Sequence, residues 1–96
     1  MKILALEHEL PNITAEQFQQ YAIDEARKVW EYHQAGIIRE LYFRSDRNEA
    51  VLVLECNSVS EAQEIIAALP FVQMSLISFE VIPLKAYPGF ARLFAE

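Results

Sequence analysis

The chain has 96 residues, of which 53% are hydrophobic, so it is long enough for one domain with an apolar core and too apolar for disorder. Eight Lys and Arg against 14 Asp and Glu give a formal net charge of −6, which argues against nucleic acid and anionic membrane surfaces as partners. A lone cysteine cannot close a disulfide within the chain, and no apolar run is long enough to span a membrane, so we expect a cytoplasmic protein.

The first half of the chain has the pattern of a strand, a helix and a second strand. An apolar run over residues 2–8 predicts the first strand. Thr14 and Gln17 have the spacing of a capping box, which predicts a helix that starts at Thr14. Its apolar stripe continues for about five turns and ends before Gly36, a residue typical of helix ends. The second strand is predicted over residues 37–43.

The second half nearly repeats the first. The run ILALEH at residues 3–8 returns as VLVLEC in a predicted third strand over residues 50–56. Ser58 and Glu61 form a second capping-box pattern, which predicts a helix that Pro70 ends. Two strand–helix–strand halves are therefore expected in one domain.

With a fourth strand over residues 76–84, the order βαββαβ predicts an α+β, ferredoxin-like antiparallel sheet with both helices on one face. The other face should be polar, but residues 3–6 and 51–54 are apolar on both faces. We therefore expect a second copy to cover it. Two sheets would form a homodimer with the architecture of a dimeric α+β barrel, and the apolar tail at residues 86–96 would contact other copies.

Three segments resemble the muconolactone isomerase family of the dimeric α+β barrel superfamily: GIIRELY at 36–42, SVSEA at 58–62 and ALPF at 68–71. The resemblance covers most of the chain. It implies a small barrel subunit whose relatives isomerise a lactone by proton transfer without a cofactor, often as rings of dimers. In the segment where the isomerases are expected to have TWRHLWR, only Arg39 and Leu41 are identical here, and Tyr42 is an aromatic substitute.

Proton abstraction beside a carbonyl needs a base and a group that steadies the enolate. Glu7 and Glu55 occupy equivalent places in the repeat, at the ends of two central strands read as parallel. They are therefore expected to be neighbours on one face, where burial and like charge would raise one pKa. The alternative is that both carboxylates lie in solvent at the ends of their strands.

Arg39 shares its predicted strand face with Leu41 and Phe43, so it is a candidate for holding a carboxylate ligand or an enolate. The alternative is an ion pair between subunits or within the sheet, for example with Glu80 or Glu40.

His8 and Cys56 are also equivalent in the repeat and could stand about 5 Å apart on adjacent strands, as a thiolate–imidazole pair. Two ligands are too few for zinc, so no metal is expected. His8 is retained as a candidate catalytic residue.

Aromatic and imidazole side chains of the first helix, together with one from the second strand, could line a cleft for a small apolar ligand. The alternative is that they belong to the core. These candidates are Tyr21, Trp30, His33 and Tyr42.

Three functions are compatible with these patterns. The first is a cofactor-free isomerase that transfers a proton on a small lactone or carboxylated substrate, with Glu7 or Glu55 as the base. The second is a non-catalytic module for small-ligand binding or assembly. The third is a cofactor-free monooxygenase or a haem-handling protein, for which Trp30 and His33 are the support.

Overall fold

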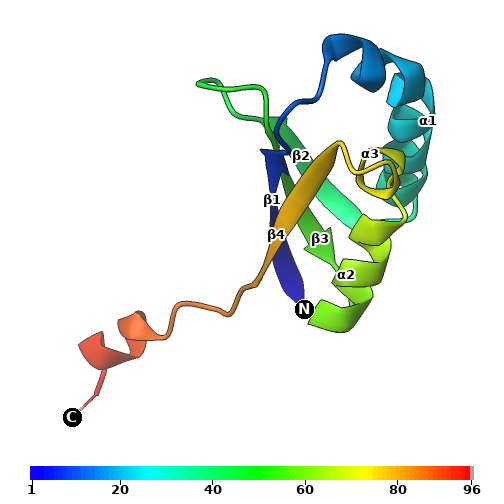
Figure 1. Cartoon of the computed structure of the whole chain (residues 1–96). Coiled ribbons are helices and arrows are strands. Elements are labelled where there is room, and N and C mark those ends of the chain that lie inside the picture. The colour runs from blue at the N-terminus through cyan, green and yellow to red at the C-terminus, as the bar shows by residue number, and fades with distance from the viewer. Residues whose placement is uncertain (96) are drawn as a thin grey trace.

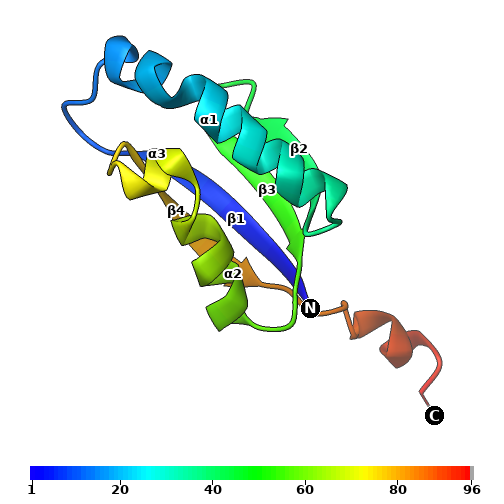
Figure 2. The ribbon, with the colours of Figure 1, turned by 90° about the vertical axis from the view of Figure 1, so that its right-hand side faces the viewer.

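The computed structural model describes residues 1–95 and shows a four-stranded antiparallel sheet whose strand order is β2-β3-β1-β4 (Figure 1). Helices α1, α2 and α3 all lie on one face of this sheet (Figure 2). The elements are β1 (Lys2–Glu9), α1 (Ala15–Gln34), β2 (Ile38–Phe43), β3 (Ala50–Glu55), α2 (Val59–Ala67), α3 (Pro70–Gln73), β4 (Ile77–Pro83) and the 3₁₀ helix η1 (Gly89–Leu93). The α+β, ferredoxin-like arrangement expected from the sequence is confirmed.

Local signals set the ends of α1. The Thr14 hydroxyl accepts from the Gln17 N–H at 3.3 Å, and the Thr14 N–H donates to the Gln17 side chain at 2.8 Å, so the capping box is complete. After the helix, Gly36 has φ +77°, a left-handed conformation that residues with a Cβ rarely adopt.

The start of α2 differs in one detail from the prediction. The Ser58 hydroxyl caps the helix by accepting from the Glu61 N–H at 3.0 Å, but the Glu61 carboxylate accepts from Asn57 rather than from Ser58. Pro70 also has a role that the sequence pattern did not suggest. Because proline suits the first turn of a helix, where its missing N–H is not needed, it begins the short helix α3.

The core lies mainly between the sheet and α2. Ile3, Ile38, Leu54 and Leu69 are fully buried, and α2 adds Ala62, Ile65 and Ile66. Helix α1, by contrast, has no buried residue along its 20 positions. The part of the sheet under α2 is thus tightly covered, whereas the part under α1 is packed more loosely.

The two halves of the chain run in opposite directions, which corrects the expectation of parallel central strands. In the β1–β3 ladder, Lys2 pairs with Glu55 and Leu6 pairs with Val51. Glu7 and Glu55 therefore lie at opposite ends of neighbouring strands, and the prediction that they are neighbours is wrong. The physical reason is that each helix returns the chain across the sheet, while the hairpin between β2 and β3 reverses its direction.

Strand β2 contains an irregularity at Arg39. Ile38 pairs with Leu54 and Glu40 pairs with the adjacent Val53, so Arg39 is the extra residue of a β-bulge. Beyond the bulge, Leu41 pairs with the buried Leu52 and so faces the helices.

The face of the sheet without helices is apolar at its centre. Strand pairing and alternation place five partly buried aliphatic side chains there: Leu4, Leu6, Val51, Val53 and Ile82. Beyond β4 the chain leaves the sheet, and η1 stands apart from the domain (Figure 1). Its Phe90, Leu93 and Phe94 are 66%, 74% and 83% exposed. No helix within residues 1–95 combines the length and apolarity needed to cross a membrane.

Candidate functional site

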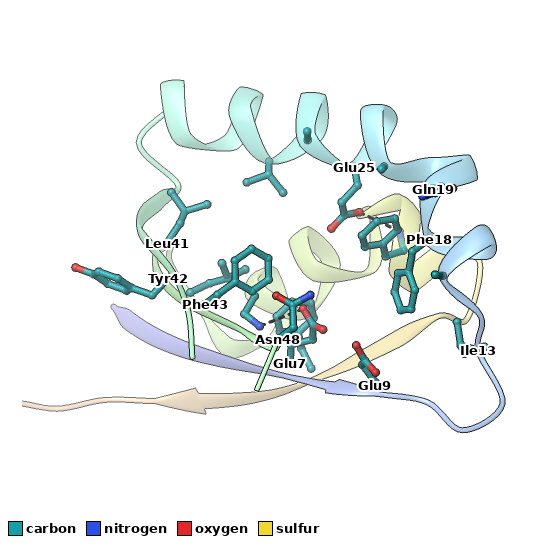
Figure 3. Close-up of a pocket in the computed structure, with 18 residues that line it drawn as sticks. Glu7, Glu9, Ile13, Phe18, Gln19, Glu25, Leu41, Tyr42, Phe43 and Asn48 are labelled. Carbon is teal, nitrogen blue, oxygen red and sulfur yellow. Dashed lines mark hydrogen bonds between the residues drawn. The ribbon is translucent and has the colours of Figure 1, made fainter. Parts of the chain in front are cut away.

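A cleft of about 800 Å³ opens between α1 and the helix-facing side of the sheet (Figure 3). The roof comes from Phe18, Ala22, Ala26 and Val29 of α1, with Phe71 of α3 at one end. The floor comes from all four strands and includes Leu41, Phe43, Ala50, Leu52 and Phe79. Most of this lining is apolar, so a small ligand of aromatic or aliphatic character would fit it.

The N-terminal half of α1 is fixed to α3 by two contacts. The rings of Phe18 and Phe71 meet edge to face, with centroids 5.2 Å apart. The Glu25 carboxylate accepts a hydrogen bond from the Phe71 N–H at 2.9 Å. These contacts hold the roof while leaving the space below it open.

Glu7 is the buried carboxylate of the cleft floor. Its side chain is 8% exposed, and it accepts a hydrogen bond from the Ala50 N–H at 3.2 Å. Burial raises the pKa of Glu7 above its ordinary value, and the negative charges of Glu9, Glu49 and Glu25 act in the same direction, while the Ala50 hydrogen bond opposes them. The site thus holds a carboxylate that is a stronger base than an exposed glutamate.

Glu25 is a second carboxylate of the cleft, and it reaches down from α1 while Glu9 rises from the end of β1 (Figure 3). Burial raises its pKa, and the hydrogen bond from Phe71 opposes the shift. The sequence interpretation missed this residue. A signal was present, because Glu25 has helical spacing to Ala22 and Val29 and so places a charge within the apolar stripe.

Glu49 lies beside these groups in the β2–β3 loop and is 9% exposed. One carboxylate oxygen accepts from the Glu9 N–H at 3.3 Å, and the other has no hydrogen-bond partner. Arg44 and Arg47 approach that second oxygen at 3.9 and 3.7 Å. Their positive charges offset part of the free-energy cost of burying the Glu49 carboxylate.

Glu55 lies outside the cleft. It is exposed at the far end of β3, where its carboxylate is 3.6 Å from the N-terminal ammonium group. His8 is also outside, on the helix-free face, with Nε2 3.8 Å from Glu80. Cys56 is buried at the other end of β1, where its N–H donates to Met1. The expected proximity of His8 and Cys56 is therefore wrong, for the same reason of strand direction.

Arg39 is exposed, and its Nε donates to the carbonyl of Gly36. None of the ion pairs formed within residues 1–95 involves it, so the alternative of an ion pair within the sheet to Glu40 or Glu80 is not found, while a pair between subunits stays a prediction. Tyr42 borders the cleft, but its side chain points away from it (Figure 3), and its hydroxyl donates to Glu40 at 2.8 Å.

The three remaining candidates lie on α1 but do not line the cleft: Tyr21, Trp30 and His33. The indole of Trp30 is 57% exposed. The Nδ1 of His33 donates to the carbonyl of Ile38 at 2.8 Å, which ties the end of α1 to β2. Neither Trp30 nor His33 therefore contributes to the cleft described above. Within residues 1–95, no group of three or more His, Cys, Asp or Glu could hold a metal ion.

Comparison with protein families shows that the muconolactone delta-isomerase model matches residues 4–89. Comparison with curated protein sequences finds no match. Among solved structures, a muconolactone isomerase is 20% identical, with a TM-score of 0.76 and 92% of each chain covered. The 5-chloro-2-hydroxyhydroquinone dehydrochlorinase of Burkholderia phenoliruptrix AC1100, solved with 2,5-dihydroxybenzoquinone, is 18% identical, with a TM-score of 0.64 and 93% of this chain and 98% of that chain covered.

Proposed function

The chain belongs to the muconolactone delta-isomerase family, and from this premise we propose that the cleft is the active site of a cofactor-free enzyme that isomerises a small lactone by proton transfer. The observation that carries the proposal is the buried Glu7 carboxylate on the floor of an apolar cleft. A general base works best when its pKa is near the operating pH, and the shift of the Glu7 pKa is in that direction.

In the proposed reaction, the ionised Glu7 removes a proton from a ring carbon whose acidity the lactone carbonyl increases. The electron pair moves into an enolate, and the Glu7 carboxyl, whose proton exchanges with solvent while the enolate is bound, returns a proton to a different carbon. No proton, electron or group is gained or lost overall, so no cofactor is needed. The apolar walls shield the reacting carbons of the enolate from unselective protonation by bulk water.

We assign the steadying of the enolate to Glu25. Burial raises the pKa of Glu25, and when its carboxyl carries a proton it can donate a hydrogen bond to the developing oxyanion. Its position on the roof, opposite the floor that holds Glu7, allows one ligand to meet both groups. Glu7 and Glu25 would thus share the work of base and hydrogen-bond donor.

We also propose that two copies pack through the helix-free faces of their sheets. The five aliphatic side chains at the centre of that face favour such a homodimer, because a sheet in contact with water would carry polar residues there. The aromatic tail at residues 86–96, in which Phe90, Leu93 and Phe94 are exposed and residue 96 lies outside the described residues, is proposed to contact other copies. The single unpaired Cys56 fits a reducing cytoplasm.

The test is deuterium exchange into muconolactone, followed by NMR in deuterated buffer. Native protein should catalyse exchange, and Glu7→Gln should reduce the rate by about 10²–10⁴-fold, the usual contribution of a general base. Glu55→Gln makes the same chemical change outside the cleft, and it should retain the native rate, as should Arg39→Ala.

The control variants also decide between the alternatives. Loss of exchange in Glu55→Gln but not in Glu7→Gln would contradict the assignment of the base. Binding of muconolactone or of its uncharged methyl ester, without exchange above buffer in either compound, by folded native protein, would support the non-catalytic binding module instead.

A further inference from the structure

The cleft has an unusual charge balance for a site that would take an acidic substrate. Among residues 1–95, its lining includes no lysine, arginine or histidine. It includes three acidic side chains, Glu7, Glu9 and Glu25, and the buried Glu49 lies directly beside them. Every ionisable side chain that faces the cleft is therefore acidic. The negative charge at the cleft comes from Glu7, Glu9 and Glu49, because Glu25 is neutral when it carries the proton assigned to it above.

The basic residues near the cleft are engaged elsewhere. Arg44 forms two hydrogen bonds with Asp46, at 2.9 and 2.6 Å, and is close to Glu49. Arg47 lies 3.7 Å from Glu49. These two arginines balance carboxylates of their own loop, so they leave the cleft without a free positive charge.

The carboxylates of the cleft would repel a negatively charged ligand. Taking an anion out of water is costly unless a cation or several hydrogen-bond donors meet it. Here the anion would meet carboxylates across a low-dielectric space instead. An uncharged ring avoids this penalty, and the side chains of Phe18, Phe43, Phe71 and Phe79 offer it apolar contact.

We propose that the cleft selects an uncharged lactone with an apolar substituent, and that it discriminates against lactones bearing a carboxylate. The inference rests on the proposed function, since it names the substrate class of the same site. The cleft of about 800 Å³ has room for a small ring and a substituent. The carbonyl that acidifies the ring C–H is retained, so the proton transfer from carbon to Glu7 and back to carbon is unchanged.

A matched pair of ligands tests this selection: muconolactone, which is ionised at neutral pH, and its methyl ester, which has the same ring without the charge. Affinity is measured by titration calorimetry, and kcat/KM by deuterium exchange. The ester should be favoured by about tenfold or more, since a like charge commonly changes such equilibria by at least one pKa unit. Equal or better binding of the ionised acid would overturn the proposal.

Separate measurement of binding and turnover distinguishes two kinds of failure. Selective binding of the ester without exchange would overturn the proposed isomerase and leave the charge selection standing. Binding of neither compound would overturn the charge selection for this ring class. If the acid is preferred and Arg92→Ala removes that preference, a cation from the tail of another copy serves the cleft, and the proposal is wrong.

A charge reversal at the mouth of the cleft gives a second test. Glu9 is exposed and lines the cleft, so Glu9→Lys should shift the preference toward the ionised acid by about tenfold. Glu16→Lys makes the same change of charge in the first turn of α1, outside the cleft, and should leave the preference as it is. An equal shift in both variants would attribute the selection to net charge, and would overturn the role of the cleft.

Discussion

The Glu7 carboxylate accepts a hydrogen bond from the Ala50 N–H, at 3.2 Å, and so links the two central strands of the cleft floor, β1 and β3. This bond stabilises the ionised form and fixes the direction of the side chain. Burial and three neighbouring carboxylates work against ionisation, and together they raise the pKa. Glu7 is therefore held in a fixed position, and its ionised form is destabilised by its surroundings. This destabilisation has several measurable consequences.

The first consequence is that Glu7→Gln should stabilise the fold at pH 7. The folded state holds the Glu7 proton more tightly than the unfolded state, whose pKa is near the ordinary 4.5, so unfolding free energy falls as pH rises from 4.5 through the folded pKa. Glutamine removes the charge and can still accept from Ala50. Each 1 kcal/mol gained would raise Tm by about 4–8 °C in a domain of this size.

Thermal unfolding at two pH values provides the check. The gain in Tm should be present at pH 7 and should disappear below pH 4.5, where Glu7 of the native protein is itself protonated. Glu55→Gln, which changes an exposed carboxylate, serves as the control. A gain for Glu7→Gln that persists unchanged at low pH would contradict the electrostatic explanation.

The pH dependence of turnover should also depend on the ionisation of Glu7. Because ionised Glu7 is the proposed base, kcat/KM should fall as pH drops through the raised pKa, at a pH above 4.5. Glu9→Gln removes a neighbouring negative charge that raises this pKa, so the acid limb should move to lower pH. Glu16→Gln, outside the cleft, should not move it. An acid limb that stays in place in Glu9→Gln would argue for another titrating group.

Substitutions of Glu25 separate its donor role from its packing role. Glutamine retains a hydrogen-bond donor and can still accept from Phe71, whereas leucine retains bulk but removes both functions. We expect Glu25→Gln to keep most of kcat, and Glu25→Leu to lose about 10²-fold or more, as for other oxyanion donors. Circular dichroism shows whether α1 survives in each. Equal activity of folded Glu25→Leu would exclude the donor role.

The helix-free face of the sheet can be tested by a single charge. Val53 lies at the centre of that face, so Val53→Lys should place an ammonium group within the proposed interface and produce monomers. Ile23 is 73% exposed on α1, away from the sheet, so Ile23→Lys is a matched control and should leave the assembly intact. Light scattering after gel filtration measures both masses.

The left-handed conformation of Gly36 leads us to expect that Gly36→Ala lowers the stability of the fold and changes nothing else. Alanine at φ +77° carries a strain of about 1–2 kcal/mol. The added Cβ meets no atom closer than 3.6 Å, so the cost should come from the backbone rather than from a clash. Urea unfolding of Gly36→Ala should show this loss without a change in the cleft's ligand preference.

The elements of the fold were predictable because their signals are local. Thr14 and Gln17 cap a helix within one turn, and Gly36 ends it, whatever the rest of the chain does. The pairing of Glu7 with Glu55 was a different kind of inference. The repeat makes them equivalent in sequence, but the halves run antiparallel, so equivalence puts them at opposite ends of the sheet.

The cleft was harder to predict, since it depends on how far α1 stands from the sheet. Glu7 was a candidate from its place at the end of an apolar strand, and the structure places it on the cleft floor, yet its neighbours Glu25 and Glu49 come from other elements. The bulge at Arg39 changed the alternation of β2, and nothing in the residue types indicated it. Side chains assigned to the cleft from helical spacing, such as Trp30, lie on other surfaces of α1.

Helix α1 has no fully buried side chain, and it is held by Phe18 near its start, by Glu25 at its middle and by His33 near its end, while Val29 and Tyr32 pack partly buried against the core. Its backbone amides should therefore exchange with solvent through local opening more readily than those at the centre of β1. A ligand in the cleft would supply the packing that the helix lacks. A bound ligand should slow amide exchange in α1 and leave the exchange of the sheet's central strands nearly unchanged. Amide exchange in α1 would therefore report ligand binding in the cleft.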